Sequence, residues 1–94
     1  MNKNILYIED NPDNMLLVKR VLNSHGYHVF EAQDGMEGLS VAEREKVDLI
    51  LLDINLPDID GYEVARRLRS NGKSSLAYVP IIAITANALS TRGT

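Results

Sequence analysis

Four short apolar runs alternate along the chain with stretches that have helical spacing. The runs are rich in β-branched residues and cover residues 5–8, 28–30, 48–52 and 79–85. A strand that is followed by a helix and then by another strand pairs in parallel, so the alternation predicts an α/β sheet with helical crossovers. The third and fourth runs are almost unbroken apolar stretches, which is typical of parallel strands that are buried on both faces.

A helix-start signal follows each of the first three runs. These signals are Asp10 or Asn11 before Pro12, the capping box Asp34-x-x-Glu37, and the capping box Asp60-x-x-Glu63. The expected order is three strand–helix units and a fourth strand, (βα)3β, followed by a tail. We expect one doubly wound domain over residues 1–94, which looks cut short after its fourth strand.

The composition excludes several classes of protein. Ten Lys and Arg against thirteen Asp and Glu give a net charge of −3, so no basic stripe for nucleic acid is expected. The absence of cysteine excludes a disulfide scaffold and cysteine-ligated zinc. No apolar run approaches the ~20 residues that span a bilayer, and residues 1–4 do not resemble a signal peptide. We therefore expect a soluble, cytoplasmic domain that binds neither nucleic acid nor membrane.

Acidic side chains follow two strands of the predicted sheet. Glu9 and Asp10 come directly after the first strand, and Asp53 ends the third. The fourth strand ends in Thr85, which carries a hydroxyl. The carboxyl ends of parallel strands meet at one edge, where open α/β sheets bind their ligands. If the first and third strands are neighbours, the three carboxylates converge in one crevice.

Three carboxylates in one crevice require protons or a cation. At about 4 Å and an effective dielectric constant near 20, each pair of like charges costs roughly 4 kcal/mol. A site with oxygen ligands and no Cys or His favours a hard ion. Mg²⁺ uses one or two carboxylates and is often completed by a phosphate. The cluster therefore predicts a Mg²⁺-assisted phosphoryl site.

Asp53 is the best-placed nucleophile of the cluster. A buried strand holds it, and an aspartate carboxylate can itself become phosphorylated. Thr85 offers a hydroxyl to a phosphoryl oxygen. Residues 34–38 lack the glycine spacing and the Lys of a nucleotide-binding loop, so the phosphoryl group is expected to arrive on another molecule.

The same residues also have plainer structural interpretations. An Asp after a strand is commonly a turn residue, and two acids there can simply begin a helix, whose N-terminus favours negative charge. The four tyrosines are scattered and imply no platform for stacking bases. The basic residues near the end of the third helix are expected to form a solvated face; they are Arg66, Arg67, Arg69 and Lys73.

Three stretches of the sequence closely resemble the receiver domain of two-component response regulators. They are residues 5–11 (ILYIEDN), 49–61 (LILLDINLPDIDG) and 80–86 (PIIAITA). They occur in the order and with the spacing of that family. The resemblance implies a flavodoxin-like fold with strand order 2-1-3-4-5, and a phosphoacceptor rather than a turnover enzyme.

The resemblance also implies a role for each site residue. Asp53 would accept a phosphoryl group from a phosphohistidine on a sensor histidine kinase or a histidine phosphotransfer protein, and would contribute to the metal site. Asp10 would bind Mg²⁺ directly and Glu9 mainly through water. The backbone carbonyl of Asn55 would be a further ligand. Thr85 would be the switch hydroxyl that moves to the phosphoryl oxygens.

The chain departs from the family pattern at its C-terminal end. A full receiver domain continues through a fourth helix, a fifth strand that ends in a Lys, and a fifth helix. That Lys pairs with the phosphoryl group, and losing such a charged hydrogen bond costs roughly 1.5–3 kcal/mol. A bare sheet edge and a bare apolar face invite association. We therefore expect a homo-oligomer, formed by association or by swapping elements.

Two other functions stay open from the sequence. A receiver-derived interaction or assembly unit with impaired signalling would be consistent with the missing segment. A haloacid-dehalogenase-like phosphohydrolase also uses an Asp nucleophile and Mg²⁺. That second function needs a longer chain and an acid two residues beyond the nucleophile, where Asn55 stands.

Overall fold

The structure, a computed structural model, describes residues 3–84. Its strands are β1 (Asn4–Ile8), β2 (His28–Ala32), β3 (Leu49–Asp53) and β4 (Ile81–Ile84). Its helices are α1 (Pro12–Ser24), α2 (Gly35–Arg44), α3 (Gly61–Arg69) and α4 (Ser74–Tyr78). Within this described part, none of the helices has the length and apolar character needed to cross a membrane.

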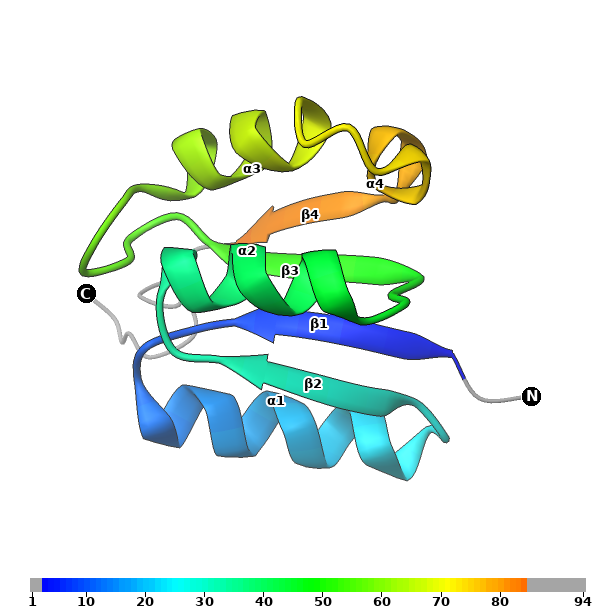
Figure 1. The fold of residues 1–94 in the computed structure, drawn as a ribbon. Helices are drawn as coiled ribbons and strands as arrows, with labels where there is room; N and C mark the ends of the chain where they lie inside the picture. The colour runs from blue at the N-terminus through cyan, green and yellow to red at the C-terminus, as the bar shows by residue number, and fades with distance from the viewer. Residues whose placement is uncertain (1–2, 85–94) are drawn as a thin grey trace.

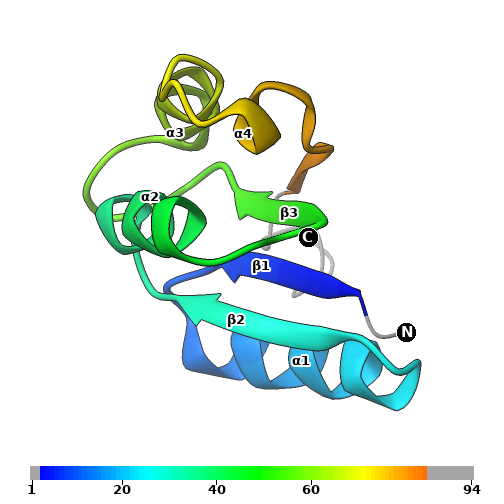
Figure 2. The ribbon, with the colours of Figure 1, turned by 45° about the vertical axis from the view of Figure 1, so that its right-hand side comes forward.

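The strands form one parallel sheet in the order β2-β1-β3-β4. The central strand β1 pairs with both β2 and β3, so that Leu6 lies opposite Phe30 on one side and Ile50 on the other. Helix α1 covers one face of the sheet, and α2 and α3 cover the other (Figures 1 and 2). The doubly wound, flavodoxin-like parallel sheet predicted from the sequence is confirmed.

Each face of the sheet has its own apolar core. Alternate residues of a strand point to opposite faces, so consecutive residues of β1 enter different cores. Leu6 belongs to the larger core, which also contains Leu68 of α3. Tyr7 belongs to the smaller core, together with Met15 of α1 and Val29 of β2.

Three helices begin at the capping residues that the sequence predicts. Asn11 Oδ1 accepts hydrogen bonds from two backbone amides of the first turn of α1, at 2.8 and 3.0 Å. Asp34 and Asp60 each accept from the amide three residues later, at 2.8 Å. Asn11 is therefore the N-cap of α1, and Asp10 is not needed for that role.

The segment from α4 to β4 differs from the sequence expectation in two ways. A helix, α4, stands between α3 and β4; its five residues are too few to show helical spacing, and only Leu76 among them is buried. The strand β4 is not buried on both faces, because Ile82 is 48% exposed. The physical reason is that α1 packs against β1 and β2, whereas β4 lies at the edge of the described sheet.

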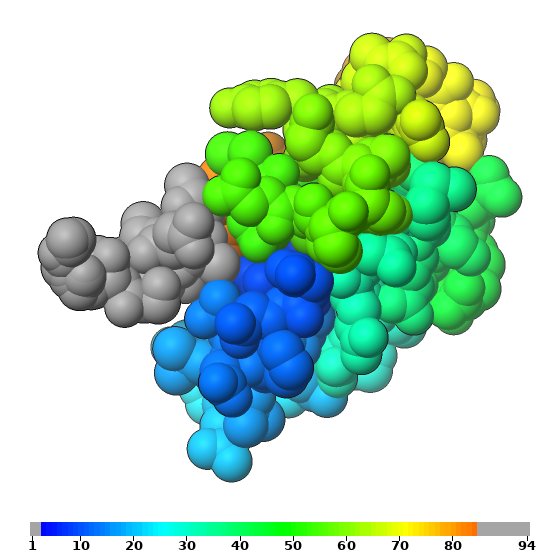
Figure 3. All heavy atoms as spheres, turned by 90° about the vertical axis from the view of Figure 1, so that its left-hand side faces the viewer, coloured from blue at the N-terminus to red at the C-terminus, as the bar shows by residue number. Residues whose placement is uncertain are grey.

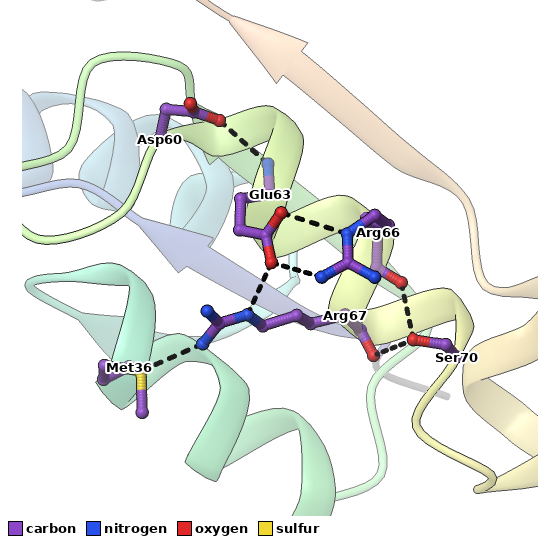
Figure 4. Close-up of polar contacts among 6 residues, drawn as sticks. All are labelled: Met36, Asp60, Glu63, Arg66, Arg67 and Ser70. Carbon is purple, nitrogen blue, oxygen red and sulfur yellow. Dashed lines mark hydrogen bonds and ion pairs between the residues drawn. The ribbon is translucent and has the colours of Figure 1, made fainter.

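The basic residues near the end of α3 are not simply a solvated face. Arg66 and Arg67 are exposed, but both pair with Glu63, at 2.5 and 2.8 Å (Figure 4). Hydrogen bonds from the two guanidinium groups hold the pKa of Glu63 at about 2. Lys73 departs most clearly from the expected solvated face. Its Nζ donates to three backbone carbonyls at the end of α2, at 3.0, 3.1 and 3.0 Å, where the helix carries partial negative charge.

Candidate metal and phosphoacceptor site

The carboxylates of Glu9, Asp10 and Asp53 lie together at the carboxyl ends of β1 and β3. One oxygen of each lies within 4.8 Å of the others. The sheet register explains why. Ile8 lies opposite Leu52, so the residues that follow them, Glu9 and Asp53, are neighbours on the face that α1 covers. The three carboxylates therefore converge, as the sequence predicts.

Glu9 is deeply enclosed, with 1% of its surface exposed. Its Oε1 accepts a hydrogen bond from the Tyr7 hydroxyl at 3.2 Å, and its Oε2 accepts one from the Asn11 amide at 3.0 Å. Burial raises the pKa of the Glu9 carboxyl above its ordinary value; the Asn11 amide opposes the rise and the nearby charge of Asp53 adds to it. A bound cation would favour the charged carboxylate and reverse this tendency.

Asp53 ends β3 as a buried residue, and the loop that follows it is tightly closed. Asp53 Oδ1 accepts from the amide of Asn55 at 3.1 Å. The amide of Gly61 donates to the carbonyl of Ile54 at 2.9 Å. A Cβ at position 61 would lie 2.8 Å from Ile54 Cα and 2.9 Å from the carbonyl oxygen of Asp53. Only glycine permits this approach, so Gly61 fixes the loop beside the candidate acceptor.

The donor set fits a hard divalent cation. Asp10 is exposed, whereas Glu9 and Asp53 are buried. Among residues 3–84, no ion pair joins any of the three carboxylates to a basic side chain. Buried carboxylates that lack a basic partner are the ligand type that Mg²⁺ prefers. Thr85, the predicted switch hydroxyl, lies outside the described residues.

A cavity of about 290 Å³ adjoins Glu9 and Asp10 on the side of α1. Met15, Leu16 and Lys19 of α1 line it as well. Figure 3 looks onto the carboxyl ends of the strands, where the start of α1 (blue), the loop after β3 (green) and the start of α2 (teal) lie side by side. Glu9 and Asp10 thus border open space at the edge of the sheet where the sequence places the ligand site.

Two residues near the site are not among the sequence candidates. The hydroxyl of Tyr7 donates a hydrogen bond to Glu9. This contact could have been predicted from the sequence, because residues two positions apart on an extended chain point to the same face. Asp58 accepts from the backbone amides of Gly35 and Met36 at 2.8 Å each, and so joins the loop after β3 to the start of α2. No local pattern reveals this contact, because it connects residues more than twenty positions apart.

Known receiver domains are similar to this chain in sequence. The family of the response regulator receiver domain matches residues 5–92. Sensor protein EvgS of Escherichia coli strain K12 is 44% identical over 84 residues, which are 89% of this chain. The chain spans 7% of the length of that protein. The polar-differentiation response regulator DivK of Brucella anthropi is 37% identical over 89 residues, and the chain spans 71% of its length.

The fold is also similar to solved receiver domains. The receiver domain of sensor histidine kinase PA1611 from Pseudomonas aeruginosa superposes with a TM-score of 0.85 and is 42% identical in sequence. The match covers 96% of this chain and 72% of that one. That crystal structure contains a magnesium ion coordinated in its active site cleft.

Proposed function

The chain belongs to the response regulator receiver domain family of two-component signalling, and we propose that its Asp53 accepts a phosphoryl group from a phosphohistidine. The donor is a sensor histidine kinase or a histidine phosphotransfer protein; the similarity to receiver domains of sensor kinases supports the kinase. The observation that carries the proposal is the convergence of Glu9, Asp10 and Asp53 within 4.8 Å at the ends of adjoining strands.

We propose that the three carboxylates and the backbone carbonyl of Asn55 form a Mg²⁺ site. Asp10 and Asp53 bind the ion directly and Glu9 acts mainly through water, because its two oxygens already accept hydrogen bonds within the protein. When bound, the ion neutralises the carboxylates and the phosphoryl oxygens. The related kinase receiver that holds magnesium supports this choice of ion.

The proposed step is a displacement at phosphorus. An oxygen of Asp53 forms a bond to phosphorus while the bond from phosphorus to the donor's imidazole nitrogen breaks, and the imidazole leaves with that electron pair. The product is an aspartyl phosphate. The end of β3 and the close approach of Gly61 hold Asp53 in place. Thr85 is proposed to donate its hydroxyl to a phosphoryl oxygen.

The test is phosphorylation by a small donor, such as acetyl phosphate, with and without Mg²⁺. Intact-mass spectrometry is expected to show a gain of one phosphoryl group that requires Mg²⁺ and that hydroxylamine removes. Asp53→Asn keeps the shape of the side chain and is expected to abolish the gain. The matched control is Asp13→Asn, an exposed acid in the first turn of α1, which is expected to be phosphorylated like the wild type.

Other results would redirect the proposal. A gain that persists in Asp53→Asn places the acceptor elsewhere, and a gain that does not need Mg²⁺ removes the metal from the step. Continuous release of inorganic phosphate without a stable adduct would indicate a phosphohydrolase, and no gain under any condition would indicate an assembly unit. Self-association and a cytoplasmic location stay predictions; sedimentation velocity tests the first.

A further inference from the structure

A buried tyrosine lies directly below the acidic cluster. Tyr7 is fully buried in the core between β1, β2 and α1, with Met15 and Val29. A buried hydroxyl needs a hydrogen-bond partner, since leaving it without one costs stability. Among the described residues, the hydroxyl of Tyr7 donates to Glu9 Oε1, at 3.2 Å. The phenol is thus placed by packing and directed at one carboxylate of the cluster.

The strand geometry makes this contact possible. Tyr7 and Glu9 are two residues apart, so their side chains share a face of the sheet, and the length of the ring carries the hydroxyl to the next carboxylate along β1. The second oxygen of Glu9 is held by the amide of Asn11 at 3.0 Å. Both oxygens of Glu9 are therefore oriented by groups that the fold itself fixes.

Resting on the function proposed above, we propose that Tyr7 is a positioning residue for the divalent-cation site: its hydroxyl holds the Glu9 carboxylate in the orientation that supports ion binding. A hydrogen-bond partner that fixes a carboxylate reduces the reorganisation needed when the ion enters. Tyr7 contributes to the site through Glu9 and does not itself bind the ion.

The experiment is isothermal titration calorimetry with Mg²⁺ on the wild type and Tyr7→Phe, which loses only the hydroxyl. The dissociation constant is expected to rise about threefold, less than the usual effect for groups that orient direct metal ligands, because Glu9 acts mainly through water. Tyr27→Phe makes the same chemical change at a tyrosine that is 39% exposed, and is expected to leave the constant unchanged. An unchanged constant in Tyr7→Phe, with normal binding by the wild type, overturns the role of Tyr7 and leaves the proposed function standing. A wild type that does not bind Mg²⁺ overturns both.

A double-mutant cycle separates positioning from general stability. If Tyr7 acts through Glu9, then Tyr7→Phe has little further effect on Mg²⁺ affinity once Glu9→Gln is present. An equal, additive loss in both backgrounds would mean that Tyr7 merely supports the fold, and would overturn the proposal.

A second measurement leaves Tyr7 intact. The chain has four tyrosines and no tryptophan. A triple variant that combines Tyr27→Phe, Tyr62→Phe and Tyr78→Phe therefore keeps Tyr7 as its single tyrosine, whose fluorescence can be followed alone. Its emission is expected to change during a Mg²⁺ titration with the same midpoint as the calorimetry, because the acceptor of its hydrogen bond changes its electrostatic surroundings. An emission that does not respond while calorimetry shows binding contradicts the proposal.

Discussion

The two faces of the sheet differ in how their helices are tied to the rest of the fold. On the face of α2 and α3, polar side chains join segments that are distant in sequence. Asp58 joins the loop after β3 to the start of α2, and Lys73 binds the carbonyls at its end. Asn71 donates to Glu43 of α2 at 2.9 Å. Helix α2 is thus held at both ends.

Within residues 3–84, one helix, α1, covers its face of the sheet, whereas α2 and α3 cover the other. The core of buried residues on the face of α1 is the smaller of the two. Leu17 and Val21 of α1 are more than half exposed, because they lie on the side of the helix that points away from Met15 and the sheet. A side-chain link from α1 to the sheet is the ion pair between Lys19 and Glu31, whose two side chains are substantially exposed. Exposed ion pairs of this kind contribute little to stability.

The two faces contribute differently to the candidate site. On the face of α2 and α3, Gly61 and Asp58 fix the loop that follows Asp53. Glu9 and Asp53 themselves point to the face of α1, where Glu9 and Asp10 line a cavity. The loop after the proposed acceptor is therefore fixed from one face of the sheet, whereas the carboxylates lie on the other face.

The largest expected effect distinguishes a buried leucine of α3 from an exposed leucine of α1. Leu68→Ala in α3, at a site 1% exposed, is expected to lower the free energy of unfolding by about 2–5 kcal/mol, because it leaves a cavity in the larger core. Leu17→Ala in α1, at a site 58% exposed, makes the same chemical change and is expected to change the free energy of unfolding by less than about 0.5 kcal/mol. Urea denaturation measures both. Equal losses would show that the buried Leu68 contributes no more to stability than the exposed Leu17.

The next effect tests the hold on the end of α2. Lys73→Met keeps the length of the side chain and removes the ammonium that three carbonyls accept from. Unfolding free energy is expected to fall by about 1–2 kcal/mol. The control Lys46→Met changes an exposed lysine of the same chain and is expected to have no measurable effect. If the two variants are equally stable, Lys73 is a surface residue as the sequence suggests.

The smallest expected effect depends on pH. Asp58 is partly desolvated, yet the amides of Gly35 and Met36 hold its pKa below the ordinary value. A carboxyl whose folded-state pKa is lowered stabilises the fold above its unfolded pKa of about 4, and loses this contribution as pH falls through the folded value. Asp58→Asn is therefore expected to cost about 0.5–1 kcal/mol at neutral pH, discounted for its exposure.

The pH profile is the control for that variant. The difference in unfolding free energy between the wild type and Asp58→Asn is expected to shrink as the pH falls below about 4, where the carboxyl takes up a proton. Thermal unfolding between neutral and acidic pH measures this. A difference that is constant over the whole range would mean that the charge of Asp58 does not contribute.

Local chemistry was sufficient to predict much of this protein. The alternation of apolar runs and capping residues predicts the parallel sheet, because strands, caps and crossovers follow short-range rules. The acids after the first and third runs predict the cluster, since parallel strands bring their carboxyl ends to one edge. The convergence of Glu9, Asp10 and Asp53 also required the first and third strands to be neighbours, which the family resemblance implied and the sheet order confirms.

Other features depend on which distant segments meet. Asp58 accepts a hydrogen bond at the start of α2, and Lys73 donates one at its end. In both cases the partners are too far apart in sequence for a local pattern to predict the contact. Tyr7 becomes a partner of Glu9 because the core encloses its ring and directs its hydroxyl to that carboxylate. Ile82 of β4 is exposed even though its run reads as a buried strand, since burial is decided by the helices that cover a strand. These contacts arise from the tertiary packing, which sets the surroundings of each side chain.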